Sequence, residues 1–309
     1  MWFKNLYLFR LAKPFSHNLD ELDDRLARLP FRSCGPLEMG SMGFVPPLGK
    51  TGVQLVQATA GRLMVCLRSE EKLLPASVVK EVVGERVAEI EEEQVRKVGR
   101  KERDRIKDEV LQDLLPRAFT RSRTTFAYVD PAAGWLIVDT ASRKRAEELT
   151  VAMRKCLDSL EILPPQVNVA PPLMMTRWLQ GEDLSTAFIV EEQCELREPA
   201  EQGSQVRLAR QDLGADEVRA HLLAGKQVVK LALSYGDRLS FVLDSTLQIR
   251  RLRFLDVVQD EADAAGGGDG GAAERFDADF ALMALEIARL LPDVLDAFGG
   301  EAPLGKGQS

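Results

Sequence analysis

Residues 71–123 constrain the fold more than any other part of the chain. Pro75 suits the first turn of a helix, and apolar residues then recur at helical spacing from Val79 to Ile90. From residue 96 to residue 107, seven lysines and arginines stand against two acids, a local charge of +5 in a chain of net charge −7. A helix with so little apolar surface has little to bury, so we predict that it projects into solvent. Gly99 lies where one helix could end and another begin, which indicates an exposed helical hairpin.

This basic run allows two interpretations. It could be the solvated face of a helix, with ion pairs such as Glu92 with Arg96 and Glu93 with Lys97. It could also be an arm that binds phosphate groups, because localised positive charge attracts polyanions. The charge pattern alone leaves both interpretations open.

Size and composition are those of a globular protein. A length of 309 residues suits one large or two ordinary domains, and an apolar fraction of 45% can fill a core. Membrane insertion is not expected, because no apolar run approaches the roughly 20 residues that a spanning helix needs. Lys4 and Arg10 interrupt the apolar beginning of the chain, which predicts a first strand rather than a signal peptide.

The residue patterns predict an α+β fold with antiparallel sheets. Phe3, Tyr7, Phe9 and Leu11 should share one face of the first strand. Helices are expected before Pro30 and over 142–163, 215–225 and 274–301, with a helical turn over 176–182. Strands are expected over 63–67, in a hairpin over 119–140, over 188–198 and 204–213, and in a meander over 226–256. The segment over 260–274 is glycine-rich and is expected to be a surface loop.

The closely spaced prolines around residues 164–172 are the best candidate for a domain boundary. We therefore expect a central region formed by 1–74 and 117–165, a helical arm over 75–116 and a C-terminal domain over 166–309.

Candidate catalytic chemistry is sparse. Neither His17 nor His221 has a cysteine or carboxylate at metal-ligand spacing. Asp277 and Asp279 could hold a divalent ion, but at helical spacing their side chains diverge by about 200°. The cysteines are far apart and form no metal or disulfide pattern, which favours a reducing cytoplasm: Cys34, Cys66, Cys156 and Cys194. No metal, cofactor or active site is predicted, and this modestly favours a binding protein.

A second group of basic residues lies on or near the strands of the second half. Its members are Arg207, Arg210, Lys226, Lys230, Arg250, Arg251 and Arg253. Arg251 and Arg253 should share one face of a strand. Such a sheet could track a phosphate backbone, or it could simply have the polar surface of a half-exposed antiparallel sheet.

Short segments of distinctive sequence occur in order from Trp2 to Phe280: WFKN, MGSMGFVPPLG, EEKLLP, IKDEVL, LLPRAF, VDTAS, KLAL, RLRF and RFDADF. Together they resemble the RdgC family of recombination-associated proteins over essentially the whole chain. The resemblance implies a ring-shaped homodimer that binds DNA without sequence preference and passes duplex DNA through a positively charged hole. It also implies restraint of the RecA recombinase and no enzymatic activity or cofactor.

The resemblance also suggests roles for individual residues. It marks Phe119 as a dimer-closing contact, and Arg210, Gln211 and Lys226 as residues that line the hole. The complete set of predicted DNA contacts is Arg96, Lys97, Arg100, Lys101, Arg117, Arg121, Arg210, Gln211, Lys226 and Lys230. Many relatives have Lys-Lys-Gln where this chain has Ala209–Gln211, which removes one positive charge per subunit. The glycine-rich segment 265–273 likewise replaces a more charged loop.

The resemblance thus predicts a homodimer that encircles double-stranded DNA, with single-stranded DNA as a further possible ligand, in the cytoplasm and on the nucleoid. One alternative is a metal-dependent DNA-processing enzyme that uses Asp277 and Asp279. Another is a protein–protein adaptor whose basic helix is only solvated.

Overall fold

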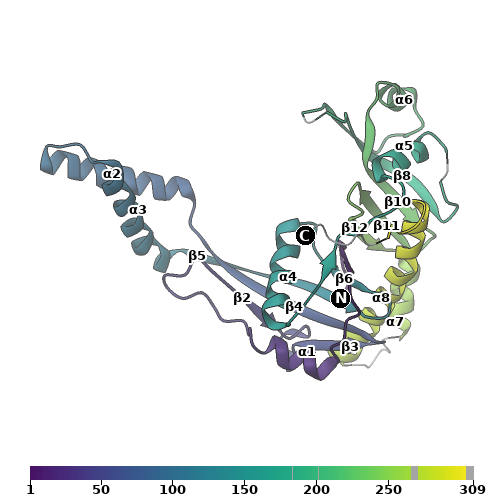
Figure 1. Cartoon of the computed structure of the whole chain (residues 1–309), viewed down its shortest axis with the longest axis horizontal. Coiled ribbons are helices and arrows are strands. Elements are labelled where there is room, and N and C mark those ends of the chain that lie inside the picture. Colours follow the sequence, from purple (N-terminus) through teal and green to yellow (C-terminus); the bar gives the residue numbers. More distant parts are fainter. Residues whose placement is uncertain (183, 201, 266–270, 304–309) are drawn as a thin grey trace.

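The computed structural model describes residues 1–182, 184–200, 202–265 and 271–303, and its fold is α+β, as predicted (Figure 1). A seven-stranded antiparallel sheet has the order β2-β4-β5-β6-β1-β7, with β3 also paired to β4. Its strands are β1 (Tyr7–Leu11), β2 (Gly40–Val45), β3 (Val56–Thr59), β4 (Arg62–Leu73), β5 (Phe119–Asp130), β6 (Trp135–Val138) and β7 (Ile162–Leu163).

A second antiparallel sheet has five strands in the order β12-β11-β10-β8-β9. They are β8 (Phe188–Arg197), β9 (Gln205–Ala209), β10 (Gln227–Tyr235), β11 (Leu239–Asp244) and β12 (Ile249–Phe254). The helices are α1 (Leu19–Leu26), α2 (Ala76–Gln94), α3 (Arg100–Leu114), α4 (Arg143–Cys156), α5 (Pro171–Leu179), α6 (Asp216–Leu223), α7 (Asp256–Ala265) and α8 (Ala272–Ala297).

The seven-stranded sheet is buried on both faces except at the ends of β2, β4 and β5 that lie nearest the hairpin segment 74–118. Tyr7, Phe9 and Leu11 of β1 pack with α1 and α4 on one face, whereas Leu8 belongs to the core on the opposite face. Phe3 also lies in that opposite core, so its predicted place beside Tyr7 is wrong. The reason is that regular strand alternation begins only at Tyr7, four residues after Phe3.

The opposite core is shared by both sheets. It contains Tyr128 and Ile137 from the first sheet, Leu231 and Phe241 from the second, and the buried face of α8, including Ile287. The backbone also joins the two sheets, because Leu6 and Ile249 each donate an N–H to the other's carbonyl oxygen, at 2.7 and 3.1 Å. This core therefore includes residues from both sides of the predicted boundary at 165/166.

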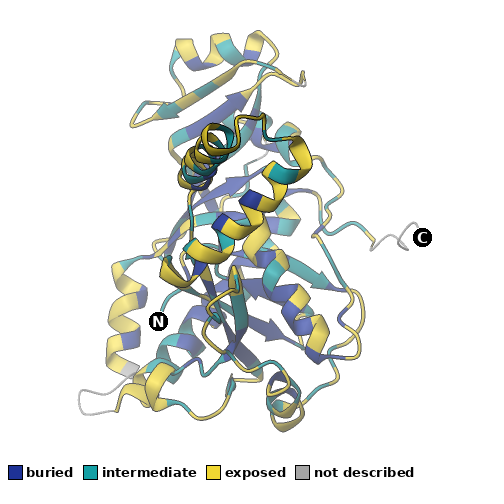
Figure 2. Cartoon of the chain, turned by 90° about the vertical axis from the view of Figure 1, so that its left-hand side faces the viewer, coloured by how far each residue is buried: buried dark blue, intermediate teal, exposed yellow. Residues whose placement is uncertain are grey.

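The helical hairpin, which we define as α2 and α3, is inserted between β4 and β5. Gly99 is the N-cap of α3, as the sequence suggested, and Val95 after α2 has a left-handed φ of 49°. Figure 1 shows the hairpin at one end of the molecule, away from both sheets. In Figure 2, where it lies in front, most of its surface is exposed. Its own core is small and consists of Val79, Val83, Ile106 and Val110.

Two predictions about helices need correction. The segment predicted as a loop from residue 260 is helical up to Ala265, because Val258 and Ala262 of α7 are one turn apart and buried. The rest of that prediction, over 266–270, lies outside the described residues. The helix predicted over 142–163 ends at Cys156, because the backbone at Leu157 is extended, although Leu157 and Leu160 are buried as expected.

Candidate nucleic-acid interface

The end of the hairpin carries the first predicted contacts. The guanidinium of Arg96 donates to both carboxylate oxygens of Glu102, at 2.7 and 2.6 Å, and Lys97 Nζ lies 2.8 Å from Glu91. The pairs predicted with Glu92 and Glu93 are wrong, because α2 ends at Gln94 and the chain turns before Arg96. The hydrogen bond from Arg96 lowers the pKa of Glu102, and that from Lys97 lowers the pKa of Glu91.

Arg100 and Lys101 lie in the first turn of α3. Both side chains are exposed, and neither makes an ion pair with another residue in the described part of the chain. Four basic residues thus gather at the far end of the hairpin, and two of them keep an uncompensated charge.

Phe119 lies at the other end of the hairpin, where β5 begins. Its side chain is 84% exposed, although it is a large apolar group. Arg117 and Arg121 beside it are exposed, and Arg121 Nε donates to Glu71 at 2.9 Å. A groove of about 530 Å³ lies along the hairpin and is lined by Leu74, Ala76, Val79, Lys80, Val83, Arg103, Asp104, Lys107 and Leu111. An exposed aromatic residue and an open groove thus occur near each other.

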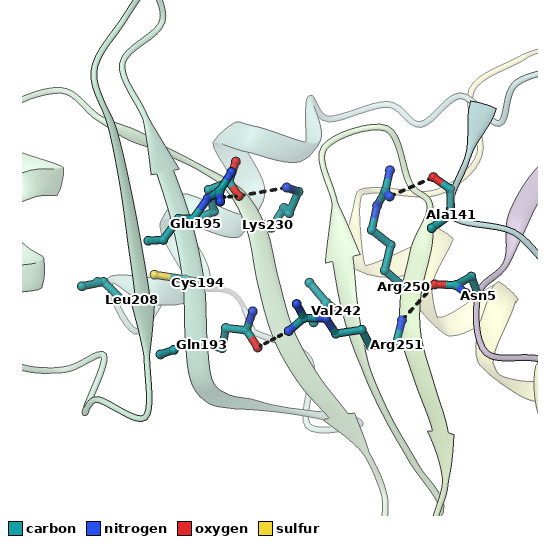
Figure 3. Close-up of a pocket in the computed structure, with 12 residues that line it drawn as sticks. Asn5, Ala141, Gln193, Cys194, Glu195, Leu208, Lys230, Val242, Arg250 and Arg251 are labelled. Atoms are coloured by element: carbon teal, nitrogen blue, oxygen red, sulfur yellow. Dashed lines mark hydrogen bonds and ion pairs between the residues drawn. The ribbon is translucent and has the colours of Figure 1, made fainter. Parts of the chain in front are cut away.

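One face of the five-stranded sheet has a hollow of about 550 Å³, which we call the cationic hollow (Figure 3). Four basic residues line it, Arg207, Lys230, Arg250 and Arg251, with Glu195 as its one acidic lining residue. Their strands bring them together: β9 contributes Arg207, β10 contributes Lys230, and β12 contributes the adjacent pair. Register explains part of this, because Glu195 pairs with Arg207 on one side and Lys230 on the other.

The remaining predicted contacts of the second half are dispersed. Arg210 directly follows β9 with a left-handed φ of 56°, and Gln211 beside it is half-buried. Lys226 precedes β10, and Gln227 pairs with Arg197, whereas Ala209 pairs with Gln193. Arg210 therefore lies near the middle of β8 and Lys226 near its C-terminal end, on opposite sides of that strand, so the structure does not bring them together.

Asp277 and Asp279 have different partners. Asp277 accepts hydrogen bonds from Gln57 Nε2 at 2.8 Å and Thr59 Oγ1 at 3.1 Å, whereas Asp279 pairs with the amino group of Met1. These contacts fasten α8 to β3 and to the beginning of the chain. Within residues 1–182, 184–200, 202–265 and 271–303, no group of three or more His, Cys, Asp or Glu side chains could hold a metal ion.

The cysteines are all free, and Cys66, Cys156 and Cys194 are buried. Burial raises the pKa of the Cys66 thiol to about 12 and that of Cys194 to about 11, so both are protonated at neutral pH. Among the helices that the structure describes, none has the length and apolar character required to cross a membrane.

Comparison with known proteins decides the family. Residues 1–301 match a family model described as "Putative exonuclease, RdgC". The chain belongs to the RdgC family. The Recombination-associated protein RdgC of Halorhodospira halophila is 45% identical over 302 residues, which cover 97% of this chain and 99% of the relative. The proteins of the same name from Pseudomonas aeruginosa and Aeromonas hydrophila are 44% and 41% identical, with coverage of 97% of this chain and 98% and 99% of theirs. The resemblance noted in the sequence is thereby confirmed.

The sequence alone did not single out the acids that hold the basic side chains. Glu195, whose side chain is 7% exposed, accepts from Lys230 Nζ at 2.8 Å and lies 3.3 Å from Arg207 Nε. Asp244, equally buried, binds Arg250 Nε at 2.6 Å. The sequence does show acidic residues among the apolar residues of these strands. It does not show the cross-strand register that places them beside the basic residues.

Proposed function

We propose that this RdgC-family protein binds duplex DNA without sequence preference, as a closed homodimer that encircles the DNA, and thereby restrains the RecA recombinase. The observation that carries this proposal is the placement of positive charge. In a chain of net charge −7, exposed cations gather at the end of the hairpin and on the open face of the five-stranded sheet. Figure 1 shows these two regions at opposite ends of the molecule, on either side of the seven-stranded sheet. Clusters of positive charge at these two places in an acidic chain suit a ring that contacts DNA on its inside.

The chemistry of these surfaces favours backbone contacts over base reading. Lysine and arginine side chains neutralise phosphates, and phosphate contacts carry no direct sequence information. The predicted contacts at the hairpin and in the second half act here as two phosphate-binding surfaces of one protomer. Single-stranded DNA is proposed as a further ligand of the same surfaces, and the protein is expected on the nucleoid.

Phe119 and the hairpin groove supply the closing contact of the dimer. In a two-fold interface, the same residue of each protomer meets the same pocket of its partner. An aromatic anchor seated in an apolar groove is the kind of contact that dominates interface energies. In this arrangement the hairpin is the arm of the ring, residues 1–74 and 117–165 are its central region, and residues 166–309 form its base.

The test is a binding titration on linear and covalently closed circular duplex DNA. If about six to ten phosphates are neutralised per dimer, log K should fall with log salt at about 0.9 per contact. Complexes that encircle circular DNA should survive a subsequent rise in salt, whereas those on linear DNA should slide off. A flat salt response, or equal release from both DNAs, would contradict the proposal. A low-resolution image of the particle gives an independent view of the ring.

The description of the family model favours a second candidate, an exonuclease. The sequence offers the region of Asp277 and Asp279 for that activity, although both side chains have structural partners here. Incubation of end-labelled DNA with Mg²⁺ or Mn²⁺ separates the two functions. Progressive shortening of the label that is lost in an Asp277→Asn variant supports the nuclease, and retarded DNA of unchanged length supports the binding protein.

A further inference from the structure

A second pocket beside the five-stranded sheet carries the opposite charge from the cationic hollow. This acidic pocket has a volume of about 340 Å³ and lies between the end of α5, the first half of β8 and the loop before α6. Its charged lining residues are Glu191, Glu192 and Asp212, and no lysine, arginine or histidine lines it. Negative charge of this kind repels phosphates, so the acidic pocket is not part of the proposed DNA-binding surfaces.

An irregularity in β8 brings both glutamates to this pocket. Adjacent residues of a regular strand point to opposite faces, yet Glu191 and Glu192 both line the pocket. Residues 191–193 stand opposite the single residue Ala232 of β10, and a bulge of this kind re-aims side chains. Because β9 pairs with β8 only from Gln193 onward, no described strand covers this edge of β8 at the two glutamates.

The charge of the two glutamates is uncompensated. Both side chains are exposed, and neither carboxylate has an ion pair or hydrogen bond in the described part of the chain. Asp212 differs, because its Oδ1 accepts a hydrogen bond from the N–H of Gly214 at 2.8 Å and so shapes the turn. Among the described residues, no group of three or more His, Cys, Asp or Glu side chains could hold a metal ion. The pocket therefore suits an organic cation.

The pocket also has a buried hydrogen-bond donor in its wall that lacks an acceptor. Trp178 lines the pocket with only 3% of its surface exposed, and its ring packs against Phe298 with the centroids 4.9 Å apart. The indole Nε1–H has no hydrogen-bond partner among the described residues. Since buried donors almost always have partners, this one indicates an acceptor that a ligand brings.

We propose that the acidic pocket binds a lysine- or arginine-bearing segment of another protein. The cation of that side chain pairs with Glu191 and Glu192, and its aliphatic part lies against the buried Leu213. A peptide carbonyl oxygen of the same segment accepts from the indole of Trp178. A peptide supplies the cation and the acceptor together, whereas a simple amine supplies only the cation. This inference goes beyond the proposed function and does not depend on DNA binding.

The size of the pocket sets the size of the segment. Ligand pockets have volumes of roughly 300–1,000 Å³, so this one is at the lower end of the range. It suits one long side chain with its adjoining peptide groups rather than the surface of a folded domain. A short blocked peptide is therefore a sufficient test ligand.

The experiment titrates the ¹⁵N-labelled protein with the peptide acetyl-Gly-Lys-Gly-amide and follows the indole Nε1–H signals by NMR. The chain has three tryptophans, and a Trp178→Phe variant identifies the signal of Trp178 by its absence. We expect a saturable shift of that signal. Acetyl-Gly-norleucine-Gly-amide lacks the cation and butylamine lacks the carbonyl groups, so each should bind at least about tenfold more weakly.

Two double variants test the glutamates. Glu191→Gln/Glu192→Gln should bind the lysine peptide at least about tenfold more weakly, with an unchanged melting temperature. The control is Glu85→Gln/Glu89→Gln, which removes the same charge from two exposed glutamates of α2 that also have no ion pair in the described part of the chain. The control variant should bind the peptide as the wild type does.

Four results would overturn the inference. The first is the absence of a saturable shift of the Trp178 signal in the wild type at about 10 mM peptide. Equal binding of the norleucine peptide would mean that the pocket recognises apolar groups, and equal binding of butylamine would mean that it recognises amines without a peptide. Equal loss in the control variant would mean general attraction to an acidic protein.

Discussion

The helical hairpin and the five-stranded sheet both present basic side chains, but they hold them differently. At the hairpin, Arg96 and Lys97 pair with Glu102 and Glu91, whose side chains are 36% and 25% exposed. On the sheet, Lys230 pairs with Glu195, which is 7% exposed. Exposed pairs contribute about 0–1 kcal/mol and exchange partners readily, whereas a buried carboxylate holds its cations strongly. The basic side chains of the hairpin can thus change position easily, whereas those of the sheet are held in place.

The supporting cores differ in the same sense. The hairpin packs around four buried residues, including Ile106 and Val110. The sheet belongs to a core that continues into the seven-stranded sheet and α8. Segments with few buried contacts open locally at low free energy, so the hairpin should open before the sheet does.

The largest expected effect concerns the closing contact at the base of the hairpin. In the proposed two-fold dimer, Phe119→Ala removes two anchors, and at about 2 kcal/mol each the loss should open the proposed interface while the protomer stays folded. Sedimentation should show more monomer, or a dimer joined at one place, with an unchanged melting temperature. Val53→Ala, at another exposed apolar residue, is the control. A variant that melts much earlier yet remains dimeric and binds DNA normally would show that Phe119 has a core role.

A pair of cavity-creating substitutions tests the difference between the cores. Leu231→Ala in β10 and Ile106→Ala in α3 each delete buried apolar groups and should cost about 2–5 kcal/mol locally. Leu231→Ala should lower the main melting transition. Ile106→Ala should leave that transition nearly in place and speed hydrogen exchange only in α2 and α3. Equal shifts of the main transition in both variants would mean that the hairpin and the body unfold as one unit.

Charge removal should affect stability differently in the two regions. Arg96→Ala with Lys97→Ala deletes exposed groups and should change the free energy of unfolding by under about 0.5 kcal/mol. Lys230→Ala leaves the buried Glu195 with its longer contacts and should cost about 1–3 kcal/mol. Both changes should weaken DNA binding, which a titration beside the melting curves will measure. If the hairpin double variant binds DNA as the wild type does, its basic residues are only solvated.

The smallest expected effect is a pH response of the hairpin. Lys97 and Arg96 hold the pKa of Glu91 and Glu102 below the usual 4.5 by hydrogen bonding. Carboxylates with a lowered folded pKa stabilise above the unfolded pKa, and this contribution is lost as the pH falls through the folded pKa. Acidification below about 4.5 should therefore loosen residues 95–99, as amide exchange or NMR can measure. Glu38, whose pKa Arg32 lowers to about 2, is the internal control. Loss of the Arg32 pair before any change in the hairpin would contradict this order.

Local patterns predicted much of the secondary structure. The three-stranded meander followed from alternation, and the end of α8 from Gly299 and Gly300, which both have positive φ. The hairpin followed from its thin apolar stripe and Gly99. Charge density likewise located the two basic regions, because lysines and arginines are visible in any sequence.

The exact composition of the site depended on features that a single sequence does not display. The register of β12 against β11 shifts between Ser240 and Val242, where Arg251 has a left-handed φ of 52°. In a strand without this irregularity, Arg250 and Arg251 would point to opposite faces. Arg96 pairs with Glu102 and not with the predicted Glu92, because α2 ends at Gln94 and Val95 has a left-handed conformation. Strand register and left-handed backbone conformations thus determine which charged side chains form pairs. The amino-acid composition shows neither feature.

The pairing at the ends of β4 and β5 has a consequence for how the chain can be altered. Leu73 at the end of β4 pairs directly with Phe119 at the beginning of β5. The 45 residues between them therefore leave and rejoin the sheet at two positions that are already paired. A two-residue Asn-Gly turn could close such an antiparallel pair without displacing another strand. The helical hairpin can therefore be lengthened, shortened or exchanged without a change in the register between β4 and β5.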